Sequence, residues 1–134
     1  MLKTFRSALR SLGSLHSAKA SGGSALKPNF VKLGSLQAFE DIEKDASSKV
    51  VLYFTASWCP PCRAIGPVYE SMSRSHPDIL FTKVDIDEIP TAAEKFHIRS
   101  VPTFVFKHKG RIIDQFSGAD QGNLEKQVLS LQDL

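Results

Sequence analysis

Residues 50–63 read VVLYFTASWCPPCR, an apolar run that leads directly into two cysteines separated by two prolines. Five consecutive apolar residues, 50–54, are typical of a strand that is buried on both faces. A helical segment is expected to follow, from Cys62 to about Arg74. Cys59 and Cys62 therefore stand at a strand-to-helix junction, and the chemistry of the chain is expected there.

The cysteine count argues against the two structural uses of cysteine. The chain has only two cysteines, three positions apart, whereas a disulfide-stapled domain needs more of them at wider spacings. A structural zinc site needs four ligands, and no spaced histidine pair completes one. We interpret the scattered histidines as surface or structural residues: His16, His76, His97 and His108. No metal site is expected, and the cysteine pair is assigned to catalysis.

Two cysteines at this spacing suit thiol–disulfide exchange. One thiol must attack a disulfide as the thiolate, and a second must lie near enough to expel the reduced product. At a helix start, unpaired N–H groups and the positive end of the helix dipole favour the thiolate of Cys59, which we expect to be the exposed sulfur. Cys62 lies one turn further along the same side and is expected to be the resolving thiol.

The rest of the chain alternates between strand and helix patterns. Ser35 is a candidate N-cap for a helix with an apolar face of Leu36, Phe39 and Ile42. The expected strands are Phe30–Leu33, Val50–Phe54, Ile79–Val84, Thr103–Phe106 and Arg111–Phe116, with a hairpin turn at Lys107–Gly110. Further helices are expected at Cys62–Arg74, Thr91–Phe96 and Asn123–Leu131. The order βαβαβαββα predicts an α/β fold with a central mixed sheet flanked by helices on both sides.

A tryptophan and a distant proline add a family resemblance. Trp58 precedes Cys59, and Pro102 stands 40 positions after Cys62, immediately before an expected strand. With these residues, the chain resembles the thioredoxin family over about residues 30–134, and residues 54–58 resemble its plant-type members. The resemblance implies a redox-active Cys59–Cys62 disulfide and a cis peptide bond before Pro102. It also implies an apolar patch on which client proteins dock: Trp58, Val101, Pro102, Gly118 and Ala119.

Other positions match the family one by one. Pro67 falls where thioredoxins kink the active-site helix, and Gly110 fits the hairpin turn. Lys83 and Asp87 match a lysine and an aspartate at the end of the third strand. By the same resemblance, the residues that tune the redox chemistry are Trp58, Pro60, Pro61, Lys83 and Asp87.

Two departures from the family concern the chemistry. Many thioredoxins carry a buried aspartate on the strand before the cysteines, thought to accept the resolving cysteine's proton, and Tyr53 takes that position here. A tyrosine with an ordinary pKa near ~10 is a weak base at neutral pH, so the proton of Cys62 must leave through water or a carboxylate elsewhere. Pro60 replaces the commoner glycine and removes an N–H donor near Cys59, which should alter the reduction potential.

The first 28 residues differ in composition from the rest. They hold five of the 17 basic residues, none of the 14 acidic ones and six serines. Apolar residues at helical spacing, with basic residues off that stripe, are typical of a mitochondrial transit peptide. We therefore expect a transit peptide at residues 1–28, a thioredoxin domain at residues 29–134 and a location in the mitochondrial matrix. A plastid or cytoplasmic location is the alternative.

The distribution of charge argues against a nucleic-acid partner. Residues 29–134 carry a formal charge of −2, because 12 basic and 14 acidic residues remain there. The basic excess thus belongs to the tail and not to a folded face. No stretch approaches the ~20 consecutive apolar residues of a membrane-spanning helix, so no membrane partner is expected.

The resemblance implies a thioredoxin-type protein-disulfide oxidoreductase that serves electron transport and redox homeostasis. Its partners would be client proteins with disulfides and an NADPH-dependent thioredoxin reductase, and we expect a monomer without a bound cofactor. One alternative is a module in which two chains share an iron–sulfur cluster through these cysteines. The other is a thiol exchanger of cytochrome maturation, a class that usually carries an inserted segment for which the interval from Cys62 to Pro102 leaves no room.

Overall fold

The computed structural model describes residues 29–45 and 48–134, and its elements follow the predicted order. The strands are β1 (Phe30–Lys32), β2 (Lys49–Thr55), β3 (Ile79–Asp85), β4 (Thr103–His108) and β5 (Arg111–Ser117). The helices are α2 (Leu36–Lys44), α3 (Pro60–Ser75), α4 (Pro90–Lys95) and α5 (Gln121–Gln132). The predicted α/β fold is confirmed, whereas the predicted transit peptide lies outside the described residues.

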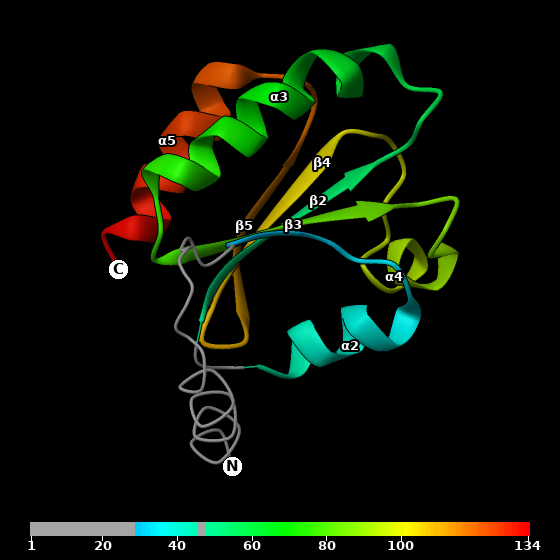
Figure 1. Cartoon of the computed structure of the whole chain (residues 1–134), viewed down its shortest axis with the longest axis horizontal. Coiled ribbons are helices and arrows are strands. Elements are labelled where there is room, and N and C mark those ends of the chain that lie inside the picture. Colours follow the sequence, from blue (N-terminus) through cyan, green and yellow to red (C-terminus); the bar gives the residue numbers. More distant parts are fainter. Residues whose placement is uncertain (1–28, 46–47) are drawn as a thin grey trace, which may run out of the picture.

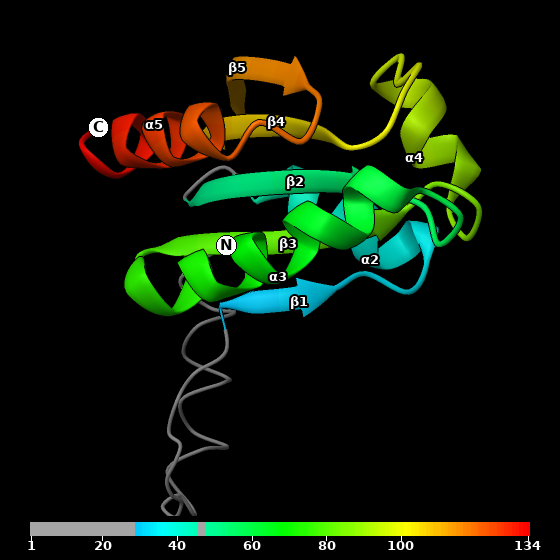
Figure 2. The same ribbon diagram turned by 90° about the horizontal axis from the view of Figure 1, so that it is seen from above.

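The five strands form one mixed sheet in the order β1-β3-β2-β4-β5, which can be followed from the bottom to the top of Figure 2. β1 and β2 both run parallel to β3. β4 runs antiparallel to β2, and β5 runs antiparallel to β4. β2 thus lies at the centre with a neighbour on each side, and Val50–Thr55 are all buried, as the apolar run predicts.

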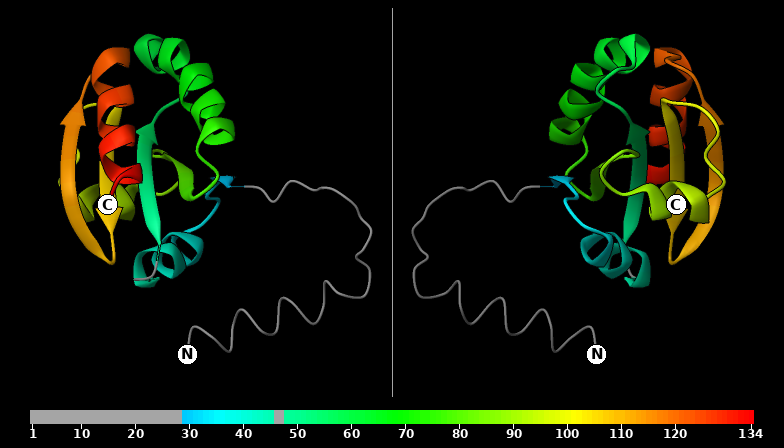
Figure 3. Two further views of the ribbon diagram at one scale, coloured as in Figure 1. Left: turned by 90° about the vertical axis from the view of Figure 1, so that its left-hand side faces the viewer. Right: turned by 90° about the vertical axis from the view of Figure 1, so that its right-hand side faces the viewer.

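Helices cover both faces of the sheet (Figures 1 and 3), as predicted. On one face, Val51 and Tyr53 of β2 join a core with α3 and α5. On the other face, Leu52 and Phe54 join a core with α2 and α4. The helices contribute Ile65, Tyr69, Met72, Leu124, Val128 and Leu131 to the first core, and Phe39 and Ala92 to the second. Alternate residues of β2 therefore enter opposite cores, which explains its continuous apolar run.

Local sequence explains where several elements begin and end. The Ser35 hydroxyl accepts the Ala38 N–H at 3.1 Å, so the predicted cap of α2 is confirmed. α3 begins at Pro60, two residues before the predicted start, because a proline in the first helical turn sacrifices no hydrogen bond. In the hairpin, Lys109 and Gly110 both have positive φ, 54° and 80°, which is typical of a two-residue turn. β4 therefore extends to His108, beyond its predicted end.

Asn29 ties the start of β1 to the rest of the domain. Its side-chain amide donates to the carbonyls of Ser73 and His76 at the end of α3, at 2.8 and 3.0 Å. It also donates to the Ile79 carbonyl at 2.9 Å. The backbone carbonyl of Asn29 accepts the Phe81 N–H at 2.7 Å. The last carbonyls of a helix lack intrahelical partners. One amide side chain binds two of them, at Ser73 and His76, and fixes β1 beside β3.

We expect the Asn29→Ala variant to lose about 1–3 kcal/mol of unfolding free energy, because three carbonyls lose a donor. Urea denaturation followed by circular dichroism measures the loss. Gln37→Ala is the matched control, since the Gln37 amide donates only to the exposed Asp41 carboxylate, at 2.9 Å. That control should change the free energy by less than about 0.5 kcal/mol. Equal, small losses in both variants would contradict the role assigned to Asn29.

Candidate active site

The two cysteines lie at the start of α3 and form a disulfide. Cys59 is the N-cap of the helix, and its Sγ accepts the Cys62 N–H at 3.2 Å. The two Cα atoms are 5.3 Å apart, within the usual range for a disulfide. The predicted places of Cys59 at the helix start and of Cys62 one turn further are confirmed.

Two prolines limit the donors available to the Cys59 sulfur. Pro60 and Pro61 occupy the first two positions of α3 and have no N–H. The Cys62 amide is therefore the first backbone N–H of the helix. The next one, from Arg63, is not available to the sulfur because it donates to the Cys59 carbonyl at 3.2 Å. A glycine at position 60 would add one N–H. The influence of Pro60 on the reduction potential stays a prediction that rests on this missing donor.

Both cysteines are buried in this disulfide form, so the expectation of an exposed Cys59 is wrong here. Cys59 is 2% exposed and Cys62 is 3% exposed. Ile86 and Val101, from distant parts of the chain, pack against the cluster that Ala56 forms with the two cysteines. The Cys59 Sγ lies 3.6 Å from the Val101 carbonyl oxygen. The surroundings of Cys59 therefore include Ile86 and Val101, two residues outside the cysteine motif.

The segment around Pro102 lies beside the disulfide. The Val101–Pro102 peptide bond is cis, as predicted, and the Pro102 carbonyl accepts the Gly118 N–H at 2.8 Å. Gly118 has a φ of +107°, and a Cβ there would meet no atom within 4 Å. Within the chain, the backbone conformation and not crowding therefore requires glycine. Val101 and Gly118 are half-buried, Ala119 is exposed and Pro102 is buried beneath them.

Trp58 projects from the site, as expected of a docking residue. It is 61% exposed, and its Nε1 donates to the Asp87 carboxylate at 2.9 Å. The backbone N–H of Asp87 in turn donates to the Asp85 carboxylate at 2.8 Å. Asp87, which sequence resemblance alone placed in the site, therefore ties the exposed indole to the turn that follows β3.

Tyr53 is part of the core beneath the cysteines. It is 1% exposed, and its hydroxyl donates to the Cys62 carbonyl at 3.1 Å. Its ring stacks on Phe104, with centroids 5.0 Å apart, and lies 4.7 Å from the Tyr69 ring. Burial raises the pKa of Tyr53 from its ordinary value of 10.0, against the opposing effect of a hydrogen bond with Thr55. The tyrosinate that could act as a base is therefore even scarcer at neutral pH.

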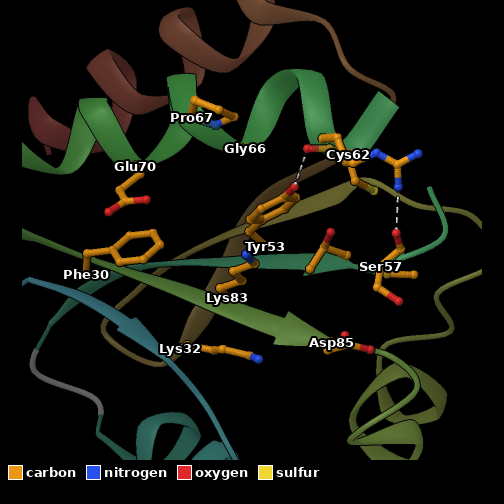
Figure 4. A pocket seen from close by; sticks show the side chains of 13 residues that line it. Phe30, Lys32, Tyr53, Ser57, Cys62, Gly66, Pro67, Glu70, Lys83 and Asp85 are labelled. Carbon is orange, nitrogen blue, oxygen red and sulfur yellow. Dashed lines mark hydrogen bonds between the residues drawn. The ribbon is translucent and has the colours of Figure 1, made fainter. Parts of the chain in front are cut away.

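A cavity of about 590 Å³ opens beside Cys62 and Tyr53, between α3 and the strands (Figure 4). Its charged lining residues are Lys32, Arg63, Glu70, Lys83 and Asp85. Lys83 therefore lies in this cavity, whereas Asp87, predicted with it as a redox-tuning residue, lies at Trp58. Sequence reasoning missed the cavity and Asp85, because the lining residues come from three strands and a helix and share no motif.

The structure also bears on metal and membrane sites. Within residues 29–45 and 48–134, no group of three or more His, Cys, Asp or Glu side chains could hold a metal ion. Over the same part of the chain, no helix is long and apolar enough to cross a membrane. The His76 ring contacts the Gln132 side chain, which is a structural contact between the ends of α3 and α5.

Comparison with known proteins identifies similar chains. Residues 30–130 match the family profile described as Thioredoxin. The chain is 38% identical over 98 residues to Thioredoxin H5 of Arabidopsis thaliana, covering 71% of this chain and 83% of that relative. It is 50% identical over 82 residues to the TPR repeat-containing thioredoxin TDX of Oryza sativa subsp. japonica, which is 61% of this chain but only 26% of that relative.

A solved structure is similar over the same region. The oxidised form of mitochondrial thioredoxin 3 from Saccharomyces cerevisiae superposes with a TM-score of 0.69 at 34% sequence identity. The similarity covers 78% of this chain and 95% of that chain. The family profile spans every described strand and all but the last residues of α5.

Proposed function

The chain belongs to the thioredoxin family, and on this basis we propose that it is a protein disulfide reductase. One observation carries the proposal: the Cys59–Cys62 disulfide lies at the N-terminus of α3, with the Cys59 sulfur beside the carbonyl of Val101. The substrates are disulfides of client proteins. Clients dock on the exposed Trp58 and on the surface formed by Val101, Gly118 and Ala119.

The reaction has two exchange steps. The Cys59 thiolate attacks one sulfur of the client disulfide, which forms a mixed disulfide and releases the other client sulfur as a thiolate. Cys62 then loses its proton and attacks the Cys59 sulfur, which forms the Cys59–Cys62 bond and releases the second client sulfur. Two electrons have passed to the client, whose thiolates take up protons. An NADPH-dependent thioredoxin reductase returns two electrons to the protein, which acts as a monomer without a bound cofactor.

Insulin reduction tests this proposal. Reduced insulin chains precipitate, so turbidity should rise when the protein is supplied with NADPH and a thioredoxin reductase. Glutathione in place of the reductase identifies the other possible electron source. Absence of turbidity with either reductant would overturn the proposal. The two alternatives gain no support: the interval between Cys62 and Pro102 holds only the rest of α3, β3 and α4, and no observation favours a shared cluster.

We also propose that residues 1–28 direct the protein to the mitochondrial matrix. The early arginines and the helical spacing of the apolar residues in this segment, together with the similarity to a mitochondrial thioredoxin of yeast, support this location over a plastid or the cytoplasm. Fluorescent-protein fusions of the full chain and of residues 29–134 test it. Only the full chain should colocalise with a mitochondrial marker, and plastid or diffuse fluorescence of the full chain would overturn the proposal.

Removal of residues 1–28 should leave folding and turnover unchanged. The hydrogen bonds that tie β1 to α3 and β3 already start at Asn29. We therefore expect the unfolding free energy of residues 29–134 to agree with that of the full chain within about 0.5 kcal/mol. Thermal melting and the insulin assay check the two properties. A marked loss in either would show that the first 28 residues contribute to the domain.

A further inference from the structure

The resolving step of the proposed reaction needs an acceptor for the Cys62 proton. Tyr53 does not suit this role, because its hydroxyl donates to the Cys62 carbonyl at 3.1 Å. Burial also raises its pKa, so it remains protonated when Cys62 has to ionise. The acceptor must therefore be another group that Cys62 can reach.

The cavity beside Cys62 offers a route for the proton. At about 590 Å³ it exceeds by far the roughly 15 Å³ that one water needs, and its polar lining supplies hydrogen-bond partners. Two carboxylates line it, those of Glu70 and Asp85. Figure 4 shows Glu70 beside Phe30, whereas Asp85 lies at the end of β3 nearer to Ser57.

Asp85 is joined to the cysteine end of the cavity by the pairing of β2 and β3. Asp85 stands opposite Thr55 in the register, and the next residue, Ile86, donates its N–H to the Thr55 carbonyl at 2.9 Å. The Ile86 side chain packs against the cluster that contains Cys62. Glu70 instead follows Cys62 by eight residues on α3, which is roughly 12 Å along the helix axis. Asp85 is therefore better placed than Glu70 to accept the proton of Cys62.

We propose that Asp85 accepts, through water in the cavity, the proton that Cys62 loses during resolution of the mixed disulfide. The proton passes from the Cys62 thiol to the Asp85 carboxylate, and the Cys62 thiolate attacks the Cys59 sulfur as the Cys59–client bond breaks. The departing client sulfur takes up a proton from solvent, and Asp85 returns its proton to bulk water. This inference rests on the proposed reductase function and identifies the group that replaces the family's aspartate at position 53.

The other charges around the cavity are compatible with this role. Lys32 forms an ion pair with Glu88 at 3.4 Å, and Arg63 donates to the Ser57 carbonyl at 2.7 Å. Among the described residues, Lys83 makes no salt bridge, so its ammonium group is available to stabilise negative charge in the cavity. The titratable groups that line the cavity together with Asp85 are Lys32 on β1, Tyr53 on β2, Lys83 on β3, and Arg63 and Glu70 on α3. Asp87, in the following turn, donates its backbone N–H to the Asp85 carboxylate.

The Asp85→Asn variant tests the proposal with little structural change, because an asparagine oxygen can still accept the Asp87 N–H. The reduced protein is mixed with 5,5′-dithiobis(2-nitrobenzoate), which attaches thionitrobenzoate to Cys59. Attack by Cys62 then releases the thionitrobenzoate, and stopped-flow absorbance follows this second phase against pH. We expect release to be about a hundredfold slower in Asp85→Asn at mildly acid pH. The two rates should converge at alkaline pH, where hydroxide deprotonates Cys62 directly.

Two further variants separate the proton-accepting role from a structural one. Glu70→Gln removes the other carboxylate of the cavity and should leave the pH profile unchanged, whereas Asp85→Glu retains a carboxylate and should be faster than Asp85→Asn. An Asp85→Asn profile identical to that of the wild type overturns the proposal, and so does a slow phase found only in Glu70→Gln. If the reductase function itself is wrong, the wild-type protein will fail the insulin assay although its second phase is present, which distinguishes the two failures.

Discussion

The Cys62→Ser variant should stop at the mixed disulfide and accumulate covalent adducts with client proteins. Cys59 keeps its place at the N-cap of α3 in this variant, so the first attack can still occur. Because the variant lacks the Cys62 thiol, no second thiol can attack the mixed disulfide and release the client. Incubation with a matrix or cell extract, followed by non-reducing electrophoresis, should show adducts that disappear on addition of dithiothreitol.

The Cys59→Ser variant is the matched counterpart. Serine is a favourable N-cap residue, so the fold should persist while insulin reduction falls by about a thousandfold or more. No adducts should form, because Cys62 lies one turn inside α3, whereas Cys59 stands at its N-cap. Adducts in Cys59→Ser and none in Cys62→Ser would mean that the two roles are reversed.

Replacing Tyr53 by aspartate should cause the largest loss of stability. The Tyr53 ring stacks on Phe104 and contacts Tyr69 in a fully buried cluster. A small carboxyl group leaves a cavity there and loses its hydration, and the two effects together should cost about 3–5 kcal/mol of unfolding free energy. Urea denaturation measures this cost. The Tyr53→Phe control keeps the ring packing, loses only the hydrogen bond to Cys62 and should cost about 1 kcal/mol.

The same substitution should accelerate the resolving step near neutral pH. Desolvation raises the pKa of a buried carboxyl group, and a base whose pKa lies near the working pH is most effective. In an Asp85→Asn background, Tyr53→Asp should restore much of the lost rate of thionitrobenzoate release. Lack of restoration in a protein that remains folded would show that position 53 cannot exchange protons with Cys62.

Sequence patterns predicted the parts of this molecule that depend on neighbours along the chain. The buried strand β2, the cap at Ser35 and the place of Cys59 at a helix start all follow from short segments, whereas the cis bond before Pro102 was implied by the family resemblance. The burial of Cys59 did not follow, because Ile86 and Val101 cover it from other elements. A short sequence pattern does not predict contacts between elements that are distant in the chain.

The proposed proton acceptor, Asp85, is a second residue that sequence patterns could not identify. Tyr53 could be recognised as a departure from the family by counting back from Cys59, but the carboxylate that compensates could not be placed. Asp85 is adjacent to the site only because β3 pairs in register with β2, Thr55 opposite Asp85. Register is a property of the assembled sheet, and the sequence of either strand alone leaves it open.

The strand order also determines how the domain can emerge during synthesis. A chain delivered from its N-terminus can pair β1, β2 and β3 early, but β2 still lacks its second neighbour until β4 has appeared. Until residue 108 has emerged, the backbone N–H and C=O groups on one edge of β2 are open to pairing with other chains. A nascent chain that stalls in α4 should therefore be a substrate for chaperones, and folding should become committed only when the C-terminal third is released.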